Sequence, residues 1–464
     1  MAMGKRKREQ QPPLFVGHED LPQSQGHPFY VGLNQLLKTG GFDEWVEEAC
    51  VTFYKGKLGR PSMAPGVYFR CLLVGYFEGI DSERGIAWRV ADSLSLRSFL
   101  GLGLTDSTPD HSTLSRTRRL IDVETHQRVF TWVLKAVAVN GLISGKTAGI
   151  DATTLEANAA LRSIVRNDNG QPYQEFLTDL AKASGIETPT REDLTKIDKN
   201  REKKGSNEDW HNPHDPDAKI TKMKDGSTHL AHKQEHAVDM DSGAVLAVTI
   251  QPANAGDTTT WRATTEAACT NVNALIADPV TKEHVNPHAI QEVVTDKGYH
   301  SNQVMVDLKE VGITSYVSEP KRGNRNWKNK EAERIAVEAN GERVKSDLGK
   351  ELLRKRGERV ERSFAHVLET GGMRRTHLRG HENILKRMLI HVAGFNLGLV
   401  MRKVTGRGTP RGLQGGPGGL FALVLDVLMA TPGLGDLLHA LGASEAVQTV
   451  SGGGLVENGG NFVK

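Results

Sequence analysis

Three acidic residues adjoin apolar runs that are long enough to form core elements. Asp151 follows Ala-Gly-Ile in a β-like segment, Asp296 closes the run Val293-Val294-Thr295, and Glu361 borders the apolar side of a predicted helix. A carboxylate on a core element is costly unless it is paired, hydrogen-bonded or bound to a metal ion. Taken singly, each residue also fits an ordinary role: a strand-end turn for the aspartates, a surface ion pair for the glutamate.

Together, two strand aspartates and one helix glutamate suit metal-assisted cleavage of a phosphodiester. In-line attack uses two divalent ions about 4 Å apart, one activating water or a 3′-hydroxyl and the other stabilising the leaving oxygen. Mg²⁺ prefers carboxylate oxygens to His or Cys ligands. We therefore predict that the three acids converge on one Mg²⁺ pocket, where neighbouring Lys and Arg side chains offset phosphate charge.

Other chemistries are less well supported. The spacing of His229, His232 and His236 would suit zinc on a helix, but the stretch has a strand pattern, in which the three would not share one side. The three cysteines lie far apart, without the CxxC spacing of a zinc site or a disulfide framework. The sequence contains neither a GxxxxGK[ST] phosphate loop nor a GxSxG motif, so nucleotide hydrolysis and serine hydrolysis are not predicted.

Basic residues are unevenly distributed. The net charge is +3, yet the stretch 321–362 holds fourteen Lys/Arg against eight Asp/Glu, and 5–8 reads Lys-Arg-Lys-Arg. Such stretches attract nucleic acid through phosphate neutralisation, although a solvated helical surface is an equally ordinary explanation. No apolar run approaches the ~18 residues that cross a bilayer, and no secretory signal is visible. A cytoplasmic protein is expected.

The N-terminal part is predicted to be helical. Residues 1–26 have the composition of a flexible basic arm, and apolar residues then recur at helical spacing through 27–140. A helix that begins after Pro109-Asp110 carries Arg116, Arg118 and Arg119. This module fits either a helix-turn-helix DNA reader or a plain helical bundle, and the sequence leaves both open.

The remainder is predicted to be a mixed α/β domain at 145–401, with a polar insertion at about 160–227. The expected order is strand 148–155, hairpin 232–239 and 244–250, helix 258–277, strand 291–296, helix 302–311, strand 313–317, helix 354–368 and helix 382–401. This order favours a mixed layered sheet over a doubly wound parallel one. Residues 402–464 are expected to form a Gly-rich linker and a short C-terminal helical tail.

Several short motifs occur in a specific order. They are Gly59-Arg60-Pro61-Ser62, Asp110 to Leu114, Gly149 to Thr153, Val293 to Tyr299, and Arg359 to Ala365 followed by Gly372-Met373-Arg374-Arg375. From about Pro28 to Met401, the chain thereby resembles the DDE transposases of bacterial insertion sequences. The resemblance implies an RNase H-like mixed sheet flanked by helices, preceded by an all-α N-terminal DNA-binding domain.

The resemblance also implies an activity and a set of site residues. The activity is Mg²⁺-dependent DNA strand cleavage and strand transfer at the ends of an insertion sequence; a catalytically degenerate or purely hydrolytic RNase H-like DNA-binding protein is the alternative. Asp151, Asp296 and Glu361 would hold two Mg²⁺ ions, for which Mn²⁺ can substitute. The implied DNA contacts are Lys297, Tyr299, Arg359, Arg362, Arg116, Arg118 and Arg119.

The implied partners are double-stranded DNA, at both terminal repeats and target, and further copies of the chain on that DNA. No membrane and no nucleotide cofactor are implied, and the protein would associate with the bacterial nucleoid when bound. One departure concerns the surroundings of the glutamate. Where some relatives carry Tyr, Arg and Lys, this chain has Arg354, Gly357 and Leu368, so Arg356 and Arg359 are candidate substitutes at shifted spacing.

Overall fold

The computed structural model describes residues 26–55, 62–201, 205–223, 226–321, 323 and 325–413. Two predicted segments fall outside these ranges: the N-terminal arm, except for residue 26, and positions 414–464 of the linker and tail. The motif that begins at Gly59 is described only at Ser62.

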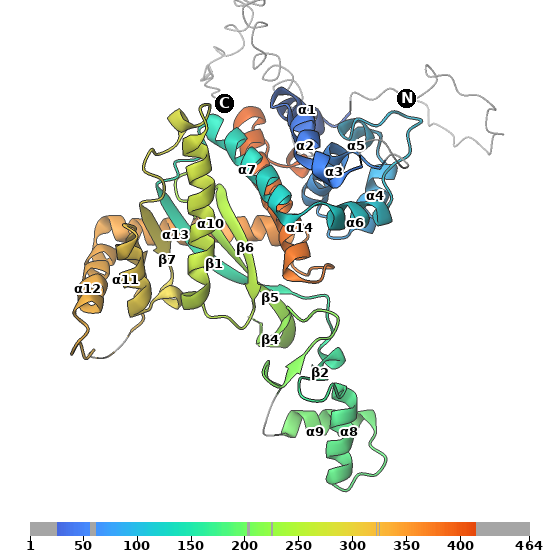
Figure 1. The fold of residues 1–464 in the computed structure, drawn as a ribbon, viewed down its shortest axis with the longest axis vertical. Helices are drawn as coiled ribbons and strands as arrows, with labels where there is room; N and C mark the ends of the chain where they lie inside the picture. The colour runs from blue at the N-terminus through green and yellow to red at the C-terminus, as the bar shows by residue number, and fades with distance from the viewer. Residues whose placement is uncertain are drawn as a thin grey trace, which may run out of the picture.

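The first part of the described chain is helical, as the apolar spacing predicted (Figure 1). Side chains of Ser82, Ser93, Asp110 and Asp122 accept hydrogen bonds from backbone N–H groups in the first turns of four of these helices. The helices are α1 Pro28–Thr39, α2 Phe42–Cys50, η2 Val51–Phe53, α3 Pro65–Glu78, α4 Glu83–Ala91, α5 Leu94–Phe99, α6 His111–Leu120 and α7 Val123–Val139.

A mixed sheet follows, with the order β4-β5-β1-β7-β8 and with β6 also paired to β5. Its strands are β1 Thr147–Glu156, β4 Lys219–Lys222, β5 Thr228–Asp239, β6 Val245–Pro252, β7 Glu292–Thr295 and β8 Thr314–Val317. β1 is antiparallel to β5 and parallel to β7, and β7 is parallel to β8. The predicted RNase H-like mixed sheet is confirmed.

Helices cover both faces and the β8 side of this sheet (Figure 1). α10 packs on β5 and β6, α13 packs across the other face, and α11 and α12 lie against β8. The elements are α10 Asp257–Ala277, η4 Lys282–His284, η5 Lys297–Tyr299, α11 Asn302–Glu310, α12 Glu331–Lys345, α13 Asp347–Ala365, a π-helical turn His366–Thr370, α14 His381–Thr405 and η7 Pro410–Leu413.

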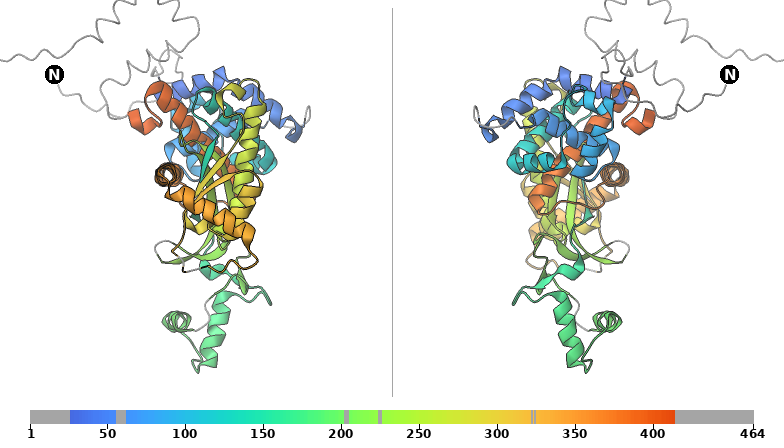
Figure 2. Two further views of the ribbon diagram at one scale, coloured as in Figure 1. Left: turned by 90° about the vertical axis from the view of Figure 1, so that its left-hand side faces the viewer. Right: turned by 90° about the vertical axis from the view of Figure 1, so that its right-hand side faces the viewer.

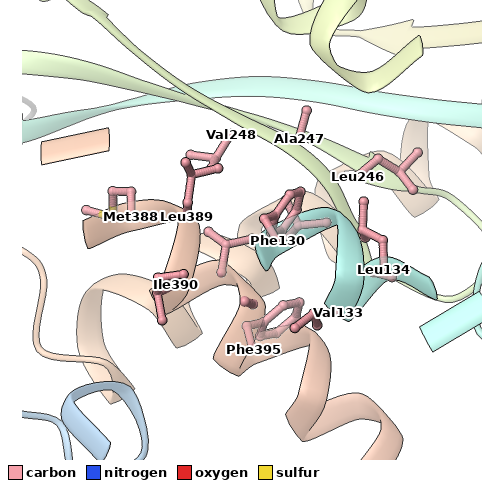
Figure 3. Packing of buried hydrophobic residues seen from close by; sticks show 14 of the residues in the cluster. Phe130, Val133, Leu134, Leu246, Ala247, Val248, Met388, Leu389, Ile390 and Phe395 are labelled. Carbon is pink, nitrogen blue, oxygen red and sulfur yellow. The ribbon is translucent and has the colours of Figure 1, made fainter. Parts of the chain in front are cut away.

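One hydrophobic core runs through the N-terminal helices and the sheet. α14 lies at its centre, packed against α3, α7 and β6. Figure 3 shows part of this core, in which Phe130 and Leu134 of α7 belong to one cluster with Leu389 of α14 and with Leu246 and Val248 of β6. The predicted boundary near residue 140 is therefore a change of secondary structure, and the core continues across it.

α14 also contains an apolar segment of membrane-spanning length. A window within His381–Gly412 is long and apolar enough to cross a bilayer, but 89% of that window is buried inside the protein. Burial on this scale is what a core helix requires. The helix also runs four residues past the predicted end at 401.

The polar insertion is ordered and carries a small core of its own. Its elements are η3 Leu161–Ser163, β2 Val165–Arg166, α8 Tyr173–Ala183, α9 Arg191–Asn200 and β3 Trp210–His211. Tyr173, Leu177, Leu194 and Trp210 are buried against one another, apart from the main core. The module extends away from the sheet, at the opposite end from the N-terminal helices (Figures 1 and 2).

Candidate active site

The register of two parallel strands places Asp151 beside Asp296. β1 pairs with β7 from Thr147 opposite Glu292 to Gly149 opposite Val294, a constant separation of 145 residues. Asp151 and Asp296 have the same separation, with Asp296 one residue past the end of β7. Neighbouring strands lie about 4.8 Å apart, and residues at one register point to the same face. Continued to this position, the register sets the backbones of the two aspartates side by side.

The strand faces that lead to both aspartates pack against α13. Two residues before Asp151, Gly149 lies under this helix, and a Cβ there would come within 3.2 Å of Val360. Val294, two residues before Asp296, packs against Leu352 of α13. Side chains two residues apart on a strand share a face, so Asp151 points toward α13. Asp296 directly follows β7, and its side chain accepts a hydrogen bond from Gly298 N.

Arg356 of α13 already contacts the first aspartate. Its Nη2 lies 2.7 Å from Asp151 Oδ2, and the guanidinium also donates weakly to Ile150 O at 3.3 Å. The Arg356 side chain is only 11% exposed, against 24% for Asp151. The pair is thus partly shielded from water, and the positive charge of Arg356 offsets the negative charge of Asp151.

His236 fixes α13 over this part of the sheet. It stands opposite Asp151 in the β1–β5 register, and its ring stacks on Phe364 at 4.3 Å between centroids. Burial lowers the pKa of His236 to about 3, so the ring is neutral. Because the Ser363 hydroxyl donates to Val360 O, its oxygen accepts from His236 Nδ1 at 2.9 Å.

Glu361 is exposed on α13. The described residues contain no group of three or more His, Cys, Asp or Glu side chains close enough to hold one ion. The strand register, continued by two residues, places the backbones of Asp151 and Asp296 at neighbouring positions, and Glu361 does not join them in such a group among the described residues. The same observation gives no support to a zinc site among the described histidines. His232 instead forms a buried pair with Asp215 at 3.2 Å.

The predicted contacts around the acids differ in accessibility. Lys297, directly after Asp296, is exposed, and Arg362 is exposed and paired with Glu358 at 2.9 Å. Arg359 is half-buried against Gly243. Tyr299 is buried, and its hydroxyl donates to Glu235 at 2.7 Å. Tyr299 is thus engaged inside the protein and not presented to DNA.

The three arginines of α6 fall into two kinds. Arg116 and Arg119 are exposed, with hydrogen bonds only to their own helix. Arg118 is buried and bonds Glu83 of α4 at 2.8 Å and Asn383 of α14 at 2.9 Å. Arg118 therefore links three helices. Of the three arginines, Arg116 and Arg119 are the two whose side chains are available to a phosphate backbone.

Sequence reasoning missed a polar network on the opposite face of the sheet. Lys233 and Glu235 are buried in β5, where Lys233 pairs with Asp257 at 2.5 Å. Burial raises the pKa of Glu235, and hydrogen bonds from Thr264 and Tyr299 partly offset that rise. The signal was present, since Lys-x-Glu in an otherwise buried strand puts two charges on one face.

The sheet order and the paired aspartates define the class of the fold: an RNase H-like core, suited to phosphodiester chemistry on nucleic acids. Residues 19–120 match the family model described as Transposase domain (DUF772), and residues 200–397 match the one described as Transposase DDE domain. The chain belongs to the insertion-sequence DDE transposases. Its activity is DNA strand cleavage and strand transfer, and nothing supports the degenerate alternative.

The two matched segments bear differently on the three acids. Asp296 and Glu361 lie within the Transposase DDE domain match, whereas Asp151 lies between the two matched segments. The assignment of Asp151 thus rests on its sequence motif and on the strand register, and not on a family match. No curated protein and no solved structure matches the chain. Members of this family normally use divalent metal ions, and the oxygen-only donors found here fit such ions.

Proposed function

We propose that Asp151, Asp296 and Glu361 are the catalytic acids and together hold two Mg²⁺ ions. The observation that carries this assignment is the shared register of Asp151 and Asp296 on the face under α13. When bound, the two ions would activate the attacking water or 3′-hydroxyl and stabilise the leaving oxygen.

The orientation of α13 supports Glu361 as the third acid. The helix crosses the strands, with Leu352 near β7 and Ser363 on β5. Arg359 points toward Gly243, in the β5–β6 turn beside the start of β1. Successive residues turn by roughly 100° around a helix, so Glu361 lies on the other side of α13, toward the end of β1. Rotation of its exposed side chain would bring the carboxylate toward the two aspartates.

The residues of the chain itself have distinct tasks in this proposal. Arg356 neutralises Asp151 before metal and DNA bind. Lys297, exposed beside Asp296, would contact a DNA phosphate near the scissile bond, because an ammonium group is a compact point charge for such contacts. Arg116 and Arg119 would contact the backbone of the element end. Arg359 and Arg362 would contact the DNA backbone or support the acids, whereas Tyr299 is bonded to Glu235 inside the protein.

The proposed substrates are the terminal repeats of the element and a target duplex, with more than one copy of the chain assembled on the DNA. A cytoplasmic location, at the nucleoid when bound, accords with such substrates. Two ends must be cut and joined in one event, which is the reason to expect an oligomer.

Labelled element ends incubated with Mg²⁺ and scored for nicking and joining test the assignment. Asp151→Asn and Glu361→Gln should each abolish both products, while binding of the ends without metal stays within about twofold of the unaltered protein. Glu351→Gln is the matched control, because Glu351 is exposed on the same helix and pairs only with Lys355. Cleavage by Glu361→Gln at the control rate would remove that residue from the site.

A further inference from the structure

The turn that carries Asp296 rests on charged groups inside the sheet. Lys233 and Glu235 alternate in β5 with His236, so they point to the α10 face, away from α13. Lys233 is 6% exposed and Glu235 is fully buried. Charges in such a place are costly unless they are paired and hydrogen-bonded, so their partners indicate what they hold in place.

Each charge is fully engaged. Lys233 Nζ donates to Asp257 Oδ1 at 2.5 Å, Thr260 Oγ1 at 2.8 Å and Ala255 O at 3.2 Å. These contacts use all three ammonium protons. Glu235 accepts from Tyr299 at 2.7 Å, from Thr260 at 3.0 Å and from Thr264. Thr260 joins the two groups, since it accepts from the lysine and donates to the glutamate.

The network touches the Asp296 turn at two adjacent residues. The second oxygen of Asp257 lies against Gly298, where an added Cβ would collide with it and would also come within 3.0 Å of Asp296 Oδ1. Gly298 N donates to that same Asp296 oxygen at 2.8 Å. The next residue, Tyr299, is the one bonded to Glu235. At Gly298 the turn is therefore packed between the carboxylates of Asp257 and Asp296, and the Tyr299 hydroxyl anchors it to Glu235.

We propose that Lys233, Glu235 and Asp257 are positioning residues for Asp296. They fix the turn from Asp296 to Tyr299, and so hold the second acid in the register that sets it beside Asp151. Lys233 also balances the charge of Asp257, which would otherwise add a repelling carboxylate close to Asp296. This inference rests on the proposed role of Asp296 as a metal ligand.

Mn²⁺ binding to the full chain without DNA, followed by titration calorimetry, tests the inference. Removing a group that orients a metal ligand typically costs about 10- to 100-fold in affinity, so Asp257→Ala should weaken Mn²⁺ binding by at least about tenfold. Cleavage should need more Mg²⁺ for half-maximal rate and recover in part at high Mg²⁺. End binding without metal should stay within about twofold.

Asp278→Ala is the matched control. Asp278 lies at the other end of α10 and pairs with Lys135 at the same 2.5 Å distance. A general weakening of α10 would affect both variants, whereas the proposed role affects only Asp257→Ala. Equal loss of Mn²⁺ affinity in the two variants would overturn the inference.

Gly298→Ala provides a second, independent test that leaves the Lys233–Asp257 pair in place, and it carries the test alone if Asp257→Ala fails to fold. Its Cβ should push the Asp257 and Asp296 carboxylates apart and weaken Mn²⁺ binding. In the Asp257→Ala background the space is free, so the second substitution should cost less than it does alone. If the two substitutions reduced Mn²⁺ affinity by independent, multiplying factors, the proposed contact between Gly298 and Asp257 would be contradicted.

Asp151→Asn in the same titration separates this inference from the proposed function. If Asp151→Asn loses Mn²⁺ binding and Asp257→Ala keeps it, only the positioning role is overturned. If Asp151→Asn also binds Mn²⁺ as the unaltered protein does, the assignment of the metal site itself is overturned.

Discussion

Arg356→Gln should make the metal-free protein bind Mn²⁺ more tightly. Arg356 Nη2 lies 2.7 Å from Asp151 Oδ2, on a carboxylate oxygen that the proposed metal site needs. Because the pair is partly buried, we assign it the value of a charge-assisted hydrogen bond, about 1.5–3 kcal/mol. An ion that displaces the guanidinium from this oxygen must overcome that free energy. Removal of the Arg356 guanidinium should lower the Mn²⁺ dissociation constant roughly 10- to 150-fold, since about 1.4 kcal/mol corresponds to tenfold.

The measurement is calorimetric titration of Mn²⁺ into the unaltered protein and the variant at one salt concentration. Arg362→Gln is the control, because Arg362 makes an exposed pair with Glu358 one turn away on the same helix. If Arg356→Gln binds Mn²⁺ no more tightly than the control, Arg356 and the metal do not compete for Asp151. A weaker affinity would mean that Arg356 orients the carboxylate for the ion.

Further substitutions in α6 and at His236 probe the DNA interface and the neutral histidine. Arg116→Ala with Arg119→Ala should lower the salt slope of end binding by up to about two, whereas Arg118→Ala should leave the slope unchanged and cost about 3 kcal/mol of unfolding free energy by stranding Glu83. The folded-state pKa of His236 is about 3 against an ordinary 6.5, so its contribution to stability is present above pH 6.5 and is lost as the pH falls. Between pH 6 and pH 4, the free energy of unfolding measured in urea should therefore fall less steeply for His236→Gln than for the unaltered protein. The difference in slope should be about 1.4 kcal/mol per pH unit.

The elements around the acids were predictable because each is set by a local pattern. Short strand-like runs bounded by turn residues predicted β5, β6, β7 and β8, and longer helix-like runs predicted α10, α11 and α14, with ends shifted by a few residues. The β5–β6 hairpin followed from its turn residues. The sequence separation of Asp151 and Asp296 has a structural cause, since it equals the register offset between the parallel strands β1 and β7. No local pattern states that register.

Side-chain roles were harder to predict because they depend on which neighbours tertiary packing supplies. Arg118 differs from Arg116 and Arg119 only by facing α4 and α14 instead of solvent. Tyr299 was expected at the DNA from the family resemblance, yet its hydroxyl is bonded to Glu235, which lies 64 residues earlier in the chain. The insertion at about 160–227 has too few apolar residues for a core to be predicted from its sequence. Trp210 and Tyr173 nevertheless form part of a small core.

The position of α14 connects the helices expected to bind DNA with the sheet that carries the aspartates. Arg118 of α6 bonds Asn383 near the start of α14, and the body of that helix packs on both α7 and β6. A close-packed interior transmits displacement and does not absorb it. A DNA end held by Arg116 and Arg119 would therefore stand at a fixed distance from Asp151. On the proposed contacts, the packed geometry between α6 and β1 would select the phosphate that is cut.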